Sequence, residues 1–172
     1  MRTITVALGE KTYNIEIAAG LLDQIGAKAR VLSQAVKAAI ISDSNVDPLY
    51  GESLERSLAA SGFEVTRIVF AAGEQSKNLT VLGQVYDELA RAGLTRSDLI
   101  LTLGGGVPGD LGGFAAATFL RGIDFIQVPT SLLAQIDSSV GGKVAIDLPS
   151  GKNLAGSFYQ PKAVFIDPDL LK

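Results

Sequence analysis

The sequence predicts an α/β fold, in which a parallel β-sheet is flanked by helices and preceded by an antiparallel β-hairpin. Between residues 37 and 129, short apolar runs alternate with amphipathic segments of helical spacing. That alternation is typical of parallel strands joined by helical crossovers. The 172 residues, 47% of them hydrophobic, match the length and composition of one globular domain.

The N-terminal part contains the hairpin and the first helices. Residues 3–8 and 12–17 alternate apolar and polar side chains around a short Gly-Glu-Lys turn, which predicts the hairpin. A helix is expected over residues 21–32. The apolar residues 37–43 predict a buried strand, and the leucine spacing of residues 46–60 predicts a second helix that ends at a Ser-Gly pair.

The chain then repeats the strand–helix order. Strands are expected at residues 63–70, 98–103 and 123–129. An amphipathic helix over residues 79–92 lies between the first two, and the apolar residues 111–120 predict the last helix. The rest of the chain is broken by glycine and proline into short pieces, as in loops that carry binding sites.

Composition excludes several kinds of site and partner. Without cysteine the chain has no thiolate metal ligands, and without histidine its acid–base chemistry has to use Lys, Asp or Glu or come from outside the chain. A net charge of −3 offers no basic surface to nucleic acid. The sequence lacks a signal-peptide pattern and an apolar stretch long enough to span a bilayer, so we expect a cytoplasmic protein without a membrane partner.

A glycine motif precedes the last predicted helix. Gly104, Gly106 and Gly109 form the pattern G-x-G-x-x-G directly after a strand. In a Rossmann-like fold this pattern holds the pyrophosphate of a dinucleotide against a helix N-terminus. Two features oppose that interpretation: residues 125–131 contain no acidic residue for a ribose, and Asp110 would repel phosphate. The alternative is a tight strand–helix turn in which Asp110 stabilises the helix N-terminus.

Two loops at expected strand ends each allow two interpretations. Glu74 and Lys77 either belong to a solvated helix start capped by Ser76 or Asn78, or they hold a ribose and a phosphate. The Ser-Asp-Ser-Asn stretch at 42–45 is either a helix cap or a group of side chains that faces a ligand at the carboxyl edge of the sheet.

Two lysines in glycine-bearing loops suggest anion capture. Asp137 precedes a glycine pair and Lys143, and Lys152 with Asn153 follows in a second loop. Backbone N–H groups and an ammonium together bind phosphate or carboxylate. The alternative is a pair of hairpin turns with exposed lysines. Arg121, at the end of an apolar helix, is typically a helix-end charge.

Four segments in this order resemble the 3-dehydroquinate synthase family: GEQSK at 73–77, GGGVPGDLGGFAAATFLRG at 104–122, VPTSLLAQIDSSVGGK at 128–143 and GKNLAGSFYQPKAVFIDPDLL at 151–171. The resemblance implies that residues 1–172 are an N-terminal NAD-binding domain. It also implies that the family's helical C-terminal domain, which holds a divalent metal (zinc or cobalt), lies outside this chain. We therefore expect no metal ligand here.

The family's reaction follows from the same resemblance. 3-Deoxy-arabino-heptulosonate 7-phosphate becomes 3-dehydroquinate and phosphate in the shikimate pathway, with NAD used catalytically by an enzyme expected to be a homodimer. The chain alone is expected to be inactive. The alternatives are a related sugar-phosphate cyclase similar to 2-deoxy-scyllo-inosose synthase, a metal-dependent polyol dehydrogenase, or a non-catalytic NAD-binding module.

The resemblance also assigns residues. Those implied to contact NAD are Asp43 and Asn45 at its adenosine, Glu74 and Lys77 at ribose and phosphate, Gly105, Gly106, Val107 and Asp110 at pyrophosphate and nicotinamide, and Thr130, Ser131, Lys152 and Leu170 elsewhere along it. Those implied to contact the sugar acid phosphate are Asp137, Lys143 and Asn153, with Arg121 reaching the phosphate in a partner subunit.

Overall fold

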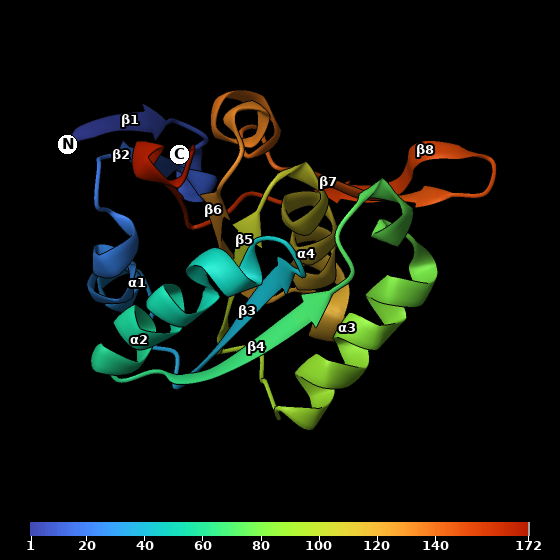
Figure 1. Cartoon of the computed structure of the whole chain (residues 1–172), viewed down its shortest axis with the longest axis horizontal. Coiled ribbons are helices and arrows are strands. Elements are labelled where there is room, and N and C mark those ends of the chain that lie inside the picture. The colour runs from blue at the N-terminus through green and yellow to red at the C-terminus, as the bar shows by residue number, and fades with distance from the viewer. Residues whose placement is uncertain (172) are drawn as a thin grey trace.

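The computed structural model describes residues 1–171, which form a seven-stranded sheet and a separate two-stranded sheet (Figure 1). The large sheet has the order β1-β2-β9-β6-β5-β3-β4, and its strands are parallel except β1, which runs antiparallel to β2. Its strands are β1 (Arg2–Val6), β2 (Tyr13–Ile17), β3 (Lys37–Asp43), β4 (Glu64–Phe70), β5 (Leu99–Gly104), β6 (Asp124–Pro129) and β9 (Ala163–Ile166). The predicted α/β class and the N-terminal hairpin are confirmed.

Helices cover both faces of this sheet (Figure 1). They are α1 (Ile25–Leu32), α2 (Glu52–Ala60), α3 (Leu79–Arg91) and α4 (Gly106–Thr118). Ile40 of β3 packs with α1 and α2, whereas its neighbour Ile41 packs with α3 and α4. Because successive side chains of a strand point to opposite faces, a strand covered on both sides is apolar throughout. This explains the continuous apolar run of β3.

Two of the predicted helices begin later than their sequence patterns suggest. α1 starts at Ile25 after a 3-10 turn at Leu22–Gln24, and α2 starts at Glu52 after a wider turn at Asp47–Gly51. The wider turn contains Pro48, which has no N–H to donate to a helix ladder.

The last helix, α4, begins earlier than residue 111, where the apolar run begins. Its first turn is made of Gly106, Val107 and Pro108, whose missing N–H costs nothing there because first-turn N–H groups have no partner within the helix. Gly112 brings α4 close to the sheet, since a Cβ there would lie 2.6 Å from the Thr102 methyl group. The glycines thus belong to the helix as well as to the turn before it.

The segment beyond β6 is more regular than expected. β7 (Lys143–Leu148) and β8 (Gly151–Phe158) form an antiparallel hairpin that projects beside α4 (Figure 1). Val144 and Ile146 fix the hairpin to the α3–α4 side of the core. β9 then inserts between β2 and β6 and joins the N-terminal hairpin to the sheet. The buried Asp167 carboxylate after β9 accepts N–H groups of Gly20 (3.1 Å) and Leu22 (3.0 Å).

Gly26 determines how closely α1 and α2 pack. A Cβ at this position would lie 1.9 Å from the backbone oxygen of Ser57. Gly26→Ala is therefore expected to lower the free energy of unfolding by roughly 1–3 kcal/mol, because the helices have to separate. The control is Gly83→Ala on α3, where a Cβ meets nothing within 4 Å, and it should stabilise by up to about 1 kcal/mol. Urea denaturation measures both, and equal stability of the two variants would contradict this account.

No helix within residues 1–171 is long and apolar enough to cross a membrane.

Candidate functional site

The candidate site lies at the carboxyl edge of the sheet, where the strand order reverses. From β3 the chain goes to β4 on one side, and then to β5 on the other side of β3. Parallel sheets bind ligands in the crevice at such a reversal. Asp43 ends β3, Gly104 ends β5 and Thr130 follows β6, so these predicted residues come to the same edge.

The N-terminus of α4 opens at this edge. Gly105 is the N-cap residue of α4. Within the described residues no side chain caps Gly105, and the first turn of α4 contains no acidic residue. Thr130 donates its N–H to the Gly104 carbonyl (2.9 Å), and a Cβ on Gly105 would lie 3.4 Å from the Ser131 hydroxyl. The loop after β6 therefore packs directly on the glycine turn, and first-turn N–H groups remain for an anion.

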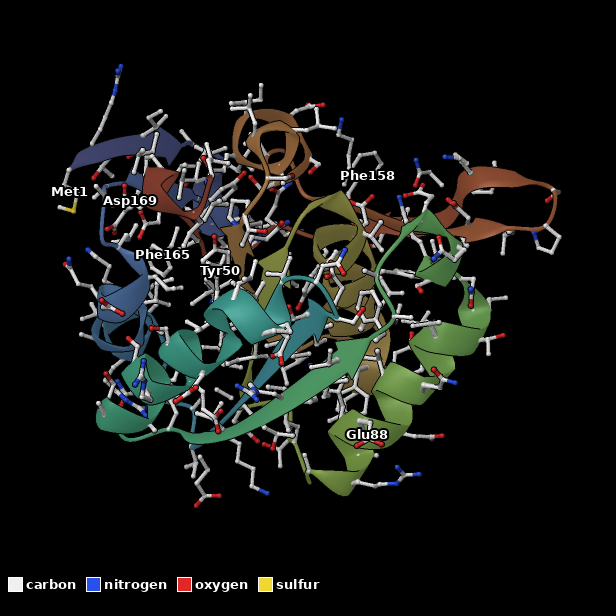
Figure 2. The ribbon with its side chains drawn as sticks, viewed as in Figure 1. Met1, Tyr50, Glu88, Phe158, Phe165 and Asp169 are labelled. Carbon is white, nitrogen blue, oxygen red and sulfur yellow. The ribbon has the colours of Figure 1, made fainter. Side chains whose placement is uncertain are left out.

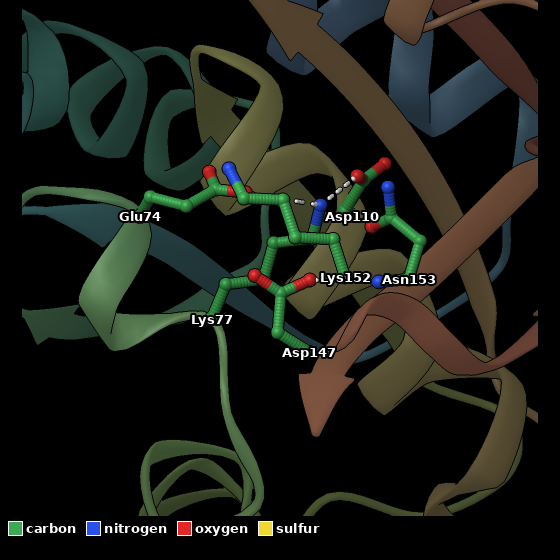
Figure 3. A network of polar contacts seen from close by, with 6 residues as sticks. All are labelled: Glu74, Lys77, Asp110, Asp147, Lys152 and Asn153. Carbon is green, nitrogen blue, oxygen red and sulfur yellow. Dashed lines mark hydrogen bonds and ion pairs between the residues drawn. The ribbon is translucent and has the colours of Figure 1, made fainter. Parts of the chain in front are cut away.

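A charged cluster adjoins this turn (Figure 3). Lys77 is 5% exposed, and its Nζ lies 2.7 Å from Asp110 Oδ2 and 4.0 Å from Glu74 Oε1. Lys152 reaches the same Glu74 oxygen at 3.4 Å. Asp110 is thus paired with a cation, which offsets the repulsion of phosphate that its carboxylate would otherwise cause. Asn78 caps α3 by accepting the Val81 N–H (3.0 Å), as its sequence position predicts.

Burial raises the pKa of Asp110, and the ion pair with Lys77 opposes this rise. An acid whose folded-state pKa is raised adds stability below its ordinary value of 3.8 and loses that contribution as pH rises through the folded value. We therefore expect the stability of the wild type relative to Asp110→Asn to fall as the pH rises from below 3.8 towards the raised folded-state pKa. Urea denaturation of both proteins across this range measures it, and a difference that grows with pH would contradict it.

A pocket of about 470 Å³ brings together residues from four segments. Its predicted members are Asp110, Asp137, Lys143 and Asn153. Sequence reasoning did not assign its other lining residues, which are Ser138, Val144, Ala145, Leu154, Gly156, Ser157 and Phe158. Most of these come from the β7–β8 hairpin, which the sequence pattern did not predict. We call this the substrate pocket.

A second pocket of about 570 Å³ lies between the start of α3 and the tip of the β7–β8 hairpin. The predicted residues Glu74 and Lys77 line it, together with Asp147, Leu148 and others that were not predicted. Lys77 also contacts Asp110 of the substrate pocket, so one ion pair joins the two pockets.

Some predicted residues lie apart from these pockets. Asp43 is buried, and its Oδ1 accepts the N–H groups of Asn45 (2.9 Å) and Val46 (3.0 Å), as in a helix cap. Leu170 packs in the α1–α2 side of the core, and its carbonyl accepts the Tyr50 hydroxyl (3.1 Å). Their role at NAD stays a prediction.

Arg121 follows the opposite end of α4, and its φ of +67° is in the left-handed region. A helix of 13 residues is about 20 Å long. Arg121 lines neither of the two pockets.

A metal centre has no candidate ligands in the part of the chain that the structure describes: no group of three or more acidic residues is placed to hold an ion.

Comparisons with known proteins agree with the geometry. The family model for the N-terminal part of 3-dehydroquinate synthase matches residues 67–172. A 3-dehydroquinate synthase of Clostridium acetobutylicum is 57% identical over this whole chain, which covers 48% of that protein. The chain thus spans about half the length of the curated relatives it matches.

Solved structures of related synthases share the fold of this chain. A 2-deoxy-scyllo-inosose synthase complexed with carbaglucose-6-phosphate, NAD⁺ and Co²⁺ matches with a TM-score of 0.91 at 30% identity, over 99% of this chain and 47% of that one. A 2-epi-5-epi-valiolone synthase from Streptomyces hygroscopicus, with NAD⁺ and Zn²⁺ bound, matches with a TM-score of 0.82 at 30% identity, over 96% and 45%. With the family model, the identity to named relatives and the shared fold in agreement, this chain belongs to the 3-dehydroquinate synthase family.

Proposed function

We propose that residues 1–172 are the NAD-binding domain of a 3-dehydroquinate synthase. The single observation that carries the proposal is the substrate pocket, where Asp137, Lys143 and Asn153 meet Asp110 beside the glycine turn of α4. We use "complete enzyme" for this chain joined to a second half such as its relatives carry. The substrate is 3-deoxy-arabino-heptulosonate 7-phosphate, and the products are 3-dehydroquinate and phosphate.

NAD fits the carboxyl edge of the sheet. The uncapped first turn of α4 offers N–H groups to the pyrophosphate, and Gly105 and Gly106 leave the backbone accessible. Lys77 offsets the phosphate charge while Glu74 accepts ribose hydroxyls. When bound, NAD takes hydride from a substrate alcohol and returns it later, so that no net oxidation occurs.

The substrate pocket supplies binding and orientation. The exposed Lys143 ammonium provides the positive charge that a carboxylate or phosphate requires, and the Asn153 amide and Asp137 carboxylate bind hydroxyl groups. Exposed apolar side chains line this pocket, among them Leu154 (59%) and Phe158 (80%, labelled in Figure 2). A second domain that packs on them would exclude water and bury the ligand more fully.

The divalent metal does not fit the described residues, and we derive no step through it. We place its ligands in the second half of the complete enzyme, with zinc or cobalt as the ion. Arg121, which lines neither pocket of its own chain, then serves the phosphate in the other subunit of a homodimer. The cytoplasmic location stays a prediction.

Two related activities remain alternatives. A sugar-phosphate cyclase similar to 2-deoxy-scyllo-inosose synthase shares the fold and takes a phosphorylated sugar. A polyol dehydrogenase would bind a neutral substrate, which would not need the positive charge of Lys143.

The test is on the chain itself. We expect it to bind NAD in a calorimetric titration and to release no phosphate from the sugar acid phosphate, because it binds the nucleotide without holding the metal. Absence of NAD binding by a folded chain would contradict the proposal. Phosphate release at a rate near about 1–10³ s⁻¹, typical of complete enzymes, would contradict the assignment of the metal ligands to the second half.

A further inference from the structure

The β7–β8 hairpin is irregular where it borders the substrate pocket. Regular pairing stops between Ile146 and Leu148, so that Asp147 of β7 faces Lys152, Asn153 and Leu154 of β8. Irregularities of this kind bend a strand and redirect side chains, and they occur often beside active sites.

Asn153 has an unusual backbone at this irregularity. Its φ is +56°, a left-handed value that it shares with few other non-glycine residues within 1–171. A residue with a Cβ keeps this conformation only when its surroundings fix it, although Asn tolerates it better than most. The conformation places Asn153 in the lining of the substrate pocket, together with Lys143.

A hydrogen bond to Asp147 fixes the left-handed backbone conformation of Asn153. Its Oδ1 accepts the Asn153 N–H at 2.8 Å, and its own N–H donates to the Lys77 carbonyl at 2.8 Å. Asp147 therefore lines the second pocket and is bonded to Lys77 of that pocket and to Asn153 of the substrate pocket. Figure 3 shows the three side chains together.

The Asp147 carboxylate is not explained by an ion pair with a lysine. Lys152 is paired with Glu74 (3.4 Å) and Lys77 with Asp110 (2.7 Å). Asp147 is also close enough to Asp110 for its charge to raise the pKa of that group. A negative charge here works against an anionic ligand. The favourable contact that the structure shows for the Asp147 side chain is its bond to the Asn153 N–H.

We propose that Asp147 is a positioning residue, whose side-chain oxygen holds the left-handed backbone of Asn153 and so keeps the Asn153 amide in the substrate pocket. The inference rests on the proposed function for the identity of the ligand, a phosphorylated sugar acid. The oxygen acts as a hydrogen-bond acceptor, so Asn at position 147 can replace Asp and Ala cannot.

The experiment compares Asp147→Ala, Asp147→Asn and the control Ser150→Ala in the complete enzyme. Ser150 is an exposed residue at the tip of the same hairpin and lines neither pocket. We expect Asp147→Ala to raise KM for the sugar acid phosphate about 5- to 10-fold, the effect of one hydrogen bond, with kcat and the Kd for NAD nearly unchanged. Asp147→Asn should restore KM to within about twofold of the wild type.

Hydrogen exchange of the Asn153 backbone N–H gives a readout that is independent of activity. It should be faster in Asp147→Ala than in the wild type, Asp147→Asn and Ser150→Ala. The proposal is wrong if Asp147→Ala matches Ser150→Ala in KM, or if a folded Asp147→Asn is as defective as Asp147→Ala. If the wild type binds no sugar acid phosphate, the proposed function fails, and exchange at Asn153 alone then decides whether Asp147 holds this backbone.

Discussion

Lys77→Met is expected to lower the free energy of unfolding by about 3 kcal/mol and to weaken NAD binding. The Lys77 side chain is 5% exposed, and its Nζ lies 2.7 Å from Asp110 Oδ2. Removal of one partner from a buried ion pair leaves an uncompensated charge, which costs about 3–5 kcal/mol. Because Asp110 retains 19% exposure, we expect the lower end of that range. Urea denaturation at neutral pH measures the loss.

Two further variants isolate the cause. The double variant Lys77→Met/Asp110→Asn carries neither charge and should be more stable than Lys77→Met alone. Lys152→Met is the matched control, since Lys152 also pairs with Glu74 but is 72% exposed. Such an exposed pair contributes less than about 1 kcal/mol. A loss in Lys77→Met no larger than in Lys152→Met would show that the buried pair does not stabilise the fold.

The second large effect is expected on substrate binding. Lys143 lines the substrate pocket, and a hydrogen bond that involves a charged group contributes roughly 1.5–3 kcal/mol. Lys143→Met in the complete enzyme should therefore weaken binding of a non-reactive substrate analogue by about 10- to 150-fold. The affinity for NAD should hardly change, because Asp110 is the only residue assigned to NAD that lines this pocket. Calorimetric titration with NAD and then with the analogue measures both affinities.

Lys152→Met, measured in the same titration, distinguishes the role of Lys152 from that of Lys143. Lys152 contacts Glu74, which is assigned to NAD, so this variant should weaken NAD binding first. If Lys143→Met lost NAD affinity and kept analogue affinity, the assignment of Lys143 to the substrate would be wrong.

Local sequence pattern predicted most of the central sheet, and its omissions have physical causes. β9 has only four residues, and its pairing with β2 joins segments far apart in the chain. No local pattern reveals such a partner. β8 contains two glycines and few apolar residues, and none of its residues is buried, so it lacks the apolar pattern of a core strand. The early start of α4 was missed because a first turn rich in glycine has the composition of a loop.

The sequence predicted which residues belong to the candidate site, but not which of them contact one another. Glycine-bearing loops indicated Lys77, Lys143 and Asn153 as candidates, whereas Asp110 was assigned from the resemblance to the family. The pairing of Lys77, which precedes α3, with Asp110 of α4 could not be predicted. This pairing would offset the repulsion between Asp110 and a phosphate at the proposed NAD site. The role of Asp147 depends on a left-handed backbone at Asn153, which no sequence pattern indicated.

The most direct test of the proposed function is product analysis of the complete enzyme supplied with NAD and 3-deoxy-arabino-heptulosonate 7-phosphate. We predict that phosphate and 3-dehydroquinate form in equal amounts, with no net accumulation of NADH, because the cofactor is regenerated in each turnover. Accumulation of NADH without release of phosphate would contradict the assignment and indicate a dehydrogenase.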